Sequence, residues 1–120
     1  MKSYLKVFLV TTMMSQGVSG QSEAHYQLLW CPVLLDFQEA SVETPSGSYV
    51  DCLGSRYAVE VDFSDKWAEC LGQALHYAAE MDRAPGCILI RKGAADRHIE
   101  RFHNTAARWG LDIRLWIVQE

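Results

Sequence analysis

The sequence predicts a single α/β domain with a mixed central sheet flanked by helices. From residue 21 onward, the patterned segments run in the order helix, three strands, helix, strand, helix, strand. Cys87 to Ile90 is a continuous apolar run, as expected for a parallel strand that is buried on both faces. A length of 120 residues with 49% hydrophobic content suits one compact domain.

Residues 1–20 have the pattern of an export signal. Lys2 and Lys6 precede a short apolar stretch at residues 7–14, and Val18 and Gly20 fit the small-residue rule before a cleavage point. We therefore expect a signal peptide at 1–20, a domain at 21–120 and a periplasmic or secreted protein. The alternative is an N-terminal strand or helix of a cytoplasmic chain. No apolar run approaches the roughly 20 residues that span a bilayer, so we expect no membrane span in the mature chain.

The first predicted element is a short helix at residues 21–30. Ser22 can cap it, Pro32 ends it, and Glu23 lies on one face with Tyr26 and Gln27. Two strands are expected next, at residues 33–44 and 49–53, with turns at 44–47 and at Gly54-Ser55.

The strand pattern is clearest at residues 57–63, where Glu60 and Asp62 share one face and the larger apolar side chains share the other. If Gly54-Ser55 is a two-residue hairpin turn, Asp51 pairs with Ala58. Asp51 and Glu60 are then diagonal neighbours about 7 Å apart at Cβ. Two carboxylates at that spacing can hold one Mg²⁺ or Mn²⁺ ion, since both ions prefer oxygen ligands. The alternative is that they are ordinary surface acids on a half-buried strand.

A longer helix is predicted from an N-cap at Ser64 to about Met81. Its apolar stripe is expected to pack on the sheet and consists of Trp67, Leu71, Ala74, Leu75 and Ala78. A second stripe carries polar groups at helical spacing and consists of Lys66, Glu69, Gln73 and Tyr77. Pro85-Gly86 is expected to end the connection to the buried strand.

The last predicted elements are a helix at residues 94–109 and a strand at 111–118, separated by Gly110. The expected core stripe of this helix is Ile99, Phe102, Ala106 and Trp109. Arg97, Arg101 and Arg108 lie on the opposite face, which either contacts nucleic-acid phosphates or is simply solvated.

Charge and cysteine content narrow the function classes. The formal net charge of −4 argues against non-specific coating of nucleic acid, although seven of the basic residues gather between residues 83 and 114. The four cysteines follow no zinc-ligand spacing. In an exported chain we favour a disulfide between Cys31 and Cys52, with Cys70 and Cys87 as buried thiols.

Asp51, the Glu60-x-Asp62 strand and Gln73-x-x-x-Tyr77, in this αβββαβ order, resemble the PD-(D/E)XK nuclease superfamily in its RecB-type branch. The resemblance implies a restriction-endonuclease-like fold in a small bacterial nuclease. It implies Asp51 and Glu60 as ligands of Mg²⁺ or Mn²⁺, with Glu23 as the acidic residue of the first helix. Gln73 and Tyr77 would then support the site or contact the substrate backbone.

This chain departs from the family at one position. The family has a lysine two residues after the second acid, and Asp62 occupies that position here. Lys66 is expected to take over as the catalytic cation, which gives a metal-dependent nuclease acting on DNA or RNA. One alternative is an inactive relative that binds nucleic acid or a protein partner. Another is a small disulfide-stabilised periplasmic binding or inhibitory protein.

Overall fold

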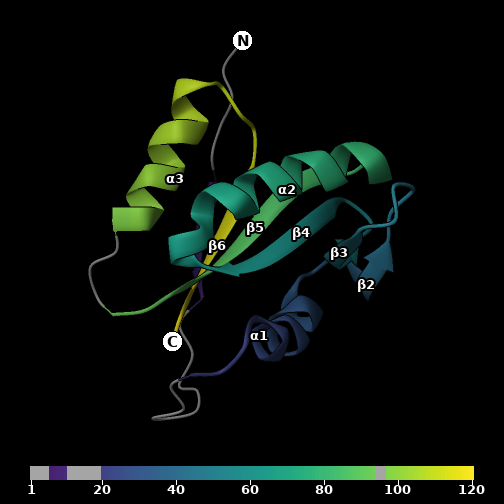
Figure 1. Ribbon diagram of the computed structural model, residues 1–120, viewed down its shortest axis with the longest axis horizontal. Helices are drawn as coiled ribbons and strands as arrows, with labels where there is room; N and C mark the ends of the chain where they lie inside the picture. The colour runs from purple at the N-terminus through teal and green to yellow at the C-terminus, as the bar shows by residue number, and fades with distance from the viewer. Residues whose placement is uncertain (1–5, 11–19, 94–96) are drawn as a thin grey trace.

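The structure, a computed structural model, describes residues 6–10, 20–93 and 97–120, with only the backbone described for residues 6–10. These residues form an α/β domain around a six-stranded sheet in the order β1-β6-β5-β4-β3-β2 (Figure 1). The elements in chain order are β1 (Lys6–Val10), α1 (Glu23–Trp30), β2 (Phe37–Glu43), β3 (Tyr49–Gly54), β4 (Tyr57–Phe63), α2 (Trp67–Met81), β5 (Ala84–Arg91), α3 (Arg97–Arg108) and β6 (Arg114–Gln119), with short 3₁₀ turns at Cys31–Val33 and Ser64–Lys66.

The connections explain the strand directions. Short loops join β2, β3 and β4, and these three strands are antiparallel. Strand β5 is parallel to β4, and β6 is parallel to β5. A helix connects each pair, because parallel neighbours need a crossover connection. The predicted mixed sheet and the predicted order of elements are both confirmed.

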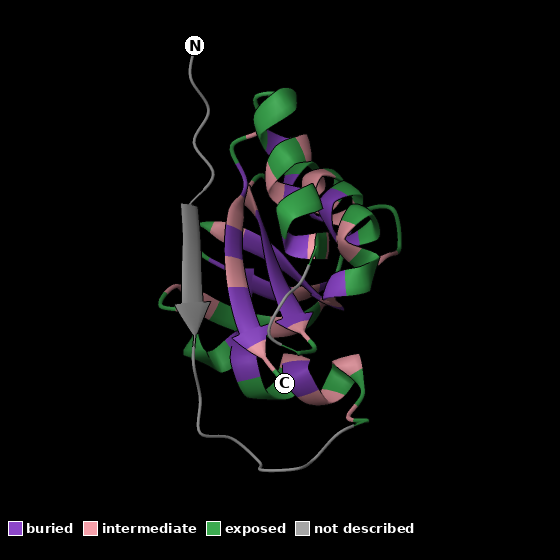
Figure 2. Ribbon diagram, turned by 90° about the vertical axis from the view of Figure 1, so that its left-hand side faces the viewer, coloured by how far each residue is buried: buried purple, intermediate pink, exposed green. Residues whose placement is uncertain are grey.

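The sheet separates two apolar layers. Helices α2 and α3 pack on one face, where they meet Cys87 and Leu89 of β5. Helix α1 and the turn at Cys31–Val33 cover part of the other face, where they meet Ile88 and Ile90. Figure 2 shows the buried strands between these layers. Because β5 is buried on both sides, its sequence is a continuous apolar run, as predicted.

Several predicted boundaries and positions are wrong. Strand β2 begins only at Phe37, because Pro32 lies in a 3₁₀ turn whose last residue was expected to belong to the strand. Pro85-Gly86 lies inside β5 and does not precede it. Trp109 is 71% exposed, because α3 ends at Arg108 and the chain turns away from the core there.

The start of α2 also differs from the prediction. Ser64 begins a 3₁₀ turn, and α2 starts three residues later, with Lys66 at its N-cap position and no side-chain cap. This turn inserts Ser64–Lys66 between the end of β4 and the helix. It puts Lys66 at the carboxyl end of β4, close to Asp62.

Most of the expected signal peptide lies outside the described residues. Within it, β1 pairs in parallel with β6 at the edge of the sheet. No helix in the described ranges is both long and apolar enough to cross a membrane. Export, and cleavage near Gln21, stay predictions.

Candidate functional site

The site is centred on the point where β3 and β4 stop pairing. Cys52 pairs with Val59 and Leu53 with Ala58, and the hairpin loop is Ser55-Arg56. The predicted turn at Gly54-Ser55 and the pairing of Asp51 with Ala58 are therefore wrong. Continued one residue past these two pairs, the register brings Asp51 beside Glu60. The error of two residues preserves the face on which each side chain lies.

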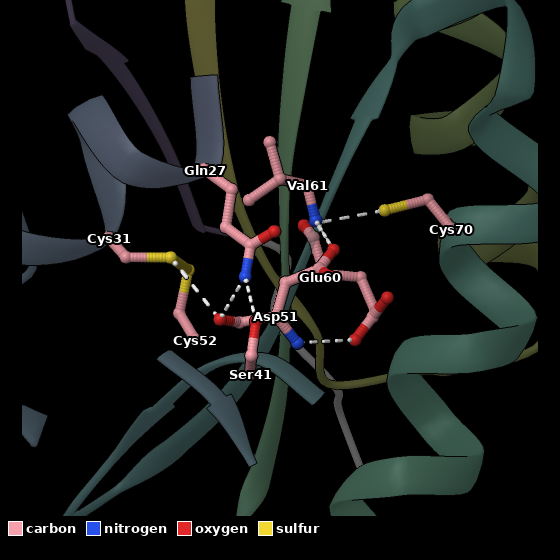
Figure 3. The surroundings of a disulfide bond; sticks show 8 residues. All are labelled: Gln27, Cys31, Ser41, Asp51, Cys52, Glu60, Val61 and Cys70. Atoms are coloured by element: carbon pink, nitrogen blue, oxygen red, sulfur yellow. Dashed lines mark hydrogen bonds between the residues drawn. A yellow bond between two sulfur atoms is a disulfide. The ribbon is translucent and has the colours of Figure 1, made fainter. Parts of the chain in front are cut away.

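Two carboxylates take the place of ladder hydrogen bonds here. The backbone N–H of Asp51 donates to Oε1 of Glu60 over 3.1 Å, and the N–H of Val61 donates to Oδ2 of Asp51 over 2.8 Å (Figure 3). Side chains thus bridge a gap that backbone groups would otherwise close. The two carboxylates lie side by side in that gap, as expected for the first pair of site residues.

Helix α1 holds Asp51 from its other side. The Nε2 atom of Gln27 donates to the backbone carbonyl of Asp51 and to Oγ of Ser41, both over 2.9 Å (Figure 3). The next residue, Cys52, forms a disulfide with Cys31, which confirms the favoured pair. Gln27 was not among the predicted site residues. Its position four residues after Glu23, on the same helical face, is the signal that was available.

The backbone around Asp51 is irregular. Val50 packs with Ala58, whereas Cys52 packs with Val59 on the other face, so the alternation of β3 breaks at Asp51. Ser41, on the neighbouring strand, has a φ of 54°. A left-handed serine inside a strand costs on the order of 1 kcal/mol, and such strain is commonest at functional positions.

The remaining predicted residues gather at the end of β4. Asp62 is only 6% exposed, and among the described residues its buried Oδ2 atom has no hydrogen-bond partner. Glu23, in the first turn of α1, is one of its closest charged neighbours. The ammonium of Lys66 lies 3.2 Å from Oε2 of Glu23, and the Lys66 side chain is 50% exposed.

Burial and mutual repulsion disturb the protonation of these carboxyls. Burial, followed by the charge of Asp51, raises the pKa of Glu60 to about 9. Burial, followed by the charge of Glu23, raises the pKa of Asp62 to about 7. Burial also raises the pKa of Asp51. The four carboxyls thus form one interacting group, and Lys66 is the cation that contacts it.

The two free cysteines adjoin the same group. The Cys70 thiol, on α2, donates to the backbone carbonyl of Glu60 over 3.6 Å, and its sulfur lies 2.8 Å from that of Cys87. Both are fully buried, which confirms the prediction of buried thiols. Cys70 therefore helps to fix α2 against β4 at the site.

The supporting and nucleic-acid-binding candidates lie further out. Tyr77 packs against the apolar cluster that contains Ala58, and Gln73 is half-buried one turn before it on α2. No hydrogen bond in the described part of the chain joins either residue to the carboxylates. Arg97 and Arg101 are exposed on α3. Helix α3 as a whole packs beside the Ser64–Lys66 turn.

The described side chains contain no group of three or more His, Cys, Asp or Glu already arranged around one metal position. What the geometry offers is a pair, Asp51 and Glu60, with a second pair, Asp62 and Glu23, beside it. No protein-family model, no curated protein and no solved structure matches this chain.

Proposed function

We propose that this protein is a divalent-metal-dependent nuclease that hydrolyses phosphodiester bonds in DNA or RNA. The observation that carries the proposal is the opening between β3 and β4. There the Asp51 and Glu60 carboxylates lie together, with Asp62, Glu23 and Lys66 next to them. The site is at the carboxyl end of a strand that is parallel to its neighbour, where α/β proteins commonly bind ligands.

The residues fit Mg²⁺ or Mn²⁺. Mg²⁺ usually takes one or two protein carboxylates and fills its other positions with water and substrate phosphate oxygens. Asp51 and Glu60 supply such a pair. The Oδ2 atom of Asp62 has no hydrogen-bond partner among the described residues, and the pKa of Glu60 is high. Both are expected of buried acids that lack a compensating cation. Because Glu60 must lose its proton to become a ligand, metal binding should release protons.

Each residue has a distinct part in this proposal. A bound metal ion polarises the phosphate and lowers the pKa of a bound water. Asp51 and Glu60 hold the ion. Each carboxylate also accepts a hydrogen bond from a backbone N–H group, which keeps it in place. Lys66 lies at the exposed side of the group, where its ammonium can stabilise the charge that develops on the phosphate. Glu23 orients Lys66 through their ion pair.

Cleavage of labelled oligonucleotides tests the proposal. Single-stranded DNA, double-stranded DNA and RNA are each incubated with the protein and Mg²⁺ or Mn²⁺, with EDTA as the metal-free control. We expect metal-dependent cleavage of at least one substrate, reduced about 100-fold or more in Glu60→Gln. Glu39→Gln, the same change at an exposed glutamate of β2, should leave the rate unchanged. Equal cleavage by the wild type and Glu60→Gln, or none by either, would contradict the proposal.

One observation favours a second candidate function, a nuclease-like protein that binds nucleic acid or a protein partner without cleaving it. Asp62 stands where the resembled family has its lysine, and Lys66 is already paired with Glu23. In that case wild-type protein would bind a labelled oligonucleotide without cutting it. Binding would survive Glu60→Gln and weaken in an Arg97→Gln, Arg101→Gln double variant.

A further inference from the structure

Helix α1 contacts both pairs of acids at the site. Its residue Gln27 donates a hydrogen bond to the backbone carbonyl of Asp51. Its residue Glu23 forms an ion pair with Lys66 and is a charged neighbour of Asp62. A helix of only eight residues is not stable by itself in water, so its position depends on how it is attached to the sheet. That attachment therefore influences both pairs of acids.

Few side chains attach α1 to the sheet. Only two of its eight residues, Tyr26 and Trp30, are buried, whereas Leu28 is 74% exposed. The disulfide between Cys31 and Cys52 adds a covalent link from the residue that follows α1 to strand β3. Because the packing is limited, this link is an important constraint on where α1 lies.

The disulfide, Gln27 and Asp51 form a closed ring of contacts (Figure 3). The backbone N–H of Cys31 donates to the carbonyl of Gln27, one helical turn earlier. The Nε2 atom of Gln27 lies 2.9 Å from the backbone oxygen of Asp51, and Cys52 is the next residue along the chain. Breaking the disulfide removes the covalent cross-link from this ring and leaves only hydrogen bonds to hold Gln27 against Asp51.

A strained residue beside the ring gives the backbone a reason to move when Gln27 leaves. The Nε2 atom of Gln27 also donates to Oγ of Ser41 over 2.9 Å, and Ser41 has a φ of 54°. A non-glycine residue stays in this left-handed region only while its surroundings hold it there. Loss of the Gln27 contacts would therefore release the strand that lies beside Asp51.

We propose that the Cys31–Cys52 disulfide regulates the metal site through Gln27, so that the oxidised protein binds Mg²⁺ or Mn²⁺ more tightly than the reduced protein. The proposal rests on the proposed metal-dependent function. In the reduction step, a dithiol passes two electrons and two protons to the protein and becomes a cyclic disulfide, while Cys31 and Cys52 become thiols. Both cysteines are fully buried, so the dithiol reaches them only when α1 moves away from the sheet.

Calorimetric titration with Mn²⁺ at pH 7 tests the proposal on the full chain. The oxidised protein is compared with the same protein after reduction by dithiothreitol and desalting under nitrogen. We expect reduction to weaken Mn²⁺ binding about tenfold or more, which is an ordinary coupling between two sites.

Two glutamine variants test the route of the coupling. Gln27→Ala, with its disulfide intact, should bind Mn²⁺ about tenfold more weakly than the oxidised wild type. Its reduction should then change the affinity less than about threefold, because the contact that transmits the effect is already lost. Gln38→Ala, at an exposed glutamine of β2, is the matched control and should behave as the wild type does.

The reverse effect gives an independent measurement. Coupling between two binding equilibria is reciprocal, so saturating Mn²⁺ should favour the disulfide by the same factor of about ten. The chain is equilibrated in mixtures of reduced and oxidised dithiothreitol, and its thiols are counted by alkylation and mass spectrometry. Glu60→Gln, which loses a metal ligand, should show no shift with Mn²⁺ and so controls for binding of the ion by dithiothreitol.

The outcomes separate this inference from the proposed function. Equal Mn²⁺ affinity in the oxidised and reduced proteins would overturn the inference and leave the metal site standing. No Mn²⁺ binding by the oxidised wild type would overturn both. Global unfolding on reduction, seen by circular dichroism, would also overturn the inference, because the disulfide would then hold the whole domain together and not only α1.

Discussion

At the scale of single residues, the protonation of Glu60 and Asp62 is the most distinctive property of the site. Both have a folded-state pKa above the unfolded value, about 9 for Glu60 and about 7 for Asp62. Such acids keep their protons in the folded protein over a pH range where the unfolded chain loses them. Their stabilising contribution is complete below about pH 4 and is lost as the pH rises through 7 and 9.

The first prediction follows from that sign. In metal-free protein the free energy of unfolding should fall between pH 5 and pH 9, as measured by urea denaturation in EDTA. Glu60→Gln should remove part of this slope and be more stable than the wild type at pH 9 by about 1 kcal/mol or more, because one pKa unit corresponds to about 1.4 kcal/mol. A stability that rises over this range, or a slope identical in Glu60→Gln, would show that the burial argument is wrong.

Lys66 gives the second residue-scale prediction. Its side chain is half exposed, and exposed ion pairs contribute little to stability, so Lys66→Met should leave the free energy of unfolding nearly unchanged. The same variant should lower the rate of cleavage about 100-fold while Mn²⁺ still binds. A full cleavage rate in Lys66→Met would remove Lys66 from the proposed chemistry.

At the scale of elements, the disulfide links the turn that follows α1 to the β3 strand that carries Asp51. Cys31 and Cys52 are 21 residues apart, and closing a loop of that length stabilises a protein by about 3 kcal/mol. The Cys31→Ser, Cys52→Ser double variant should therefore lose about 3 kcal/mol in urea denaturation. Thiol titration of the denatured, unreduced wild type should find two thiols, Cys70 and Cys87. Finding four would contradict the disulfide.

Two glycines provide a matched pair of tests for packing around the site. A Cβ at Gly54, the last residue of β3, would lie 2.8 Å from the backbone oxygen of Asp36, so Gly54→Ala should cost about 1–3 kcal/mol. Gly72 is exposed on α2, and a Cβ there would meet no atom of the described residues within 4 Å, so Gly72→Ala should stabilise by about 0.5–1 kcal/mol. The reverse order in urea denaturation would contradict the described contacts.

At the scale of the whole molecule, the features that strong local patterns specify were predictable. Alternation predicted β4 at its observed bounds, and the continuous apolar run predicted β5 as a buried parallel strand. The hairpin register was not predictable, because Gly54-Ser55 is an equally good turn by composition. The prediction that Asp51 and Glu60 meet was robust to that error, since a shift of two residues keeps the same face.

Other features depend on tertiary contacts that no local pattern records. A 3₁₀ turn follows β4 where a helix capped by Ser64 was expected. This turn places Lys66 where its side chain reaches Glu23. The hydrogen bonds of Gln27 join α1 to β2 and β3, which are distant in sequence. Trp109 is exposed because α3 ends at Arg108, whereas the helical periodicity predicted a helix that included Trp109. Such positions are where predictions from sequence are weakest.

The most direct test of the central claim is calorimetric titration of the metal-free protein with Mn²⁺ at pH 7, repeated in two buffers of different ionisation enthalpy. We expect one ion per chain, bound with net release of protons because the pKa of Glu60 is about 9 before binding. Glu60→Gln should lose this binding, and Glu39→Gln should retain it. No Mn²⁺ binding by the wild type, or equal binding by Glu60→Gln, would contradict a metal site at Asp51 and Glu60.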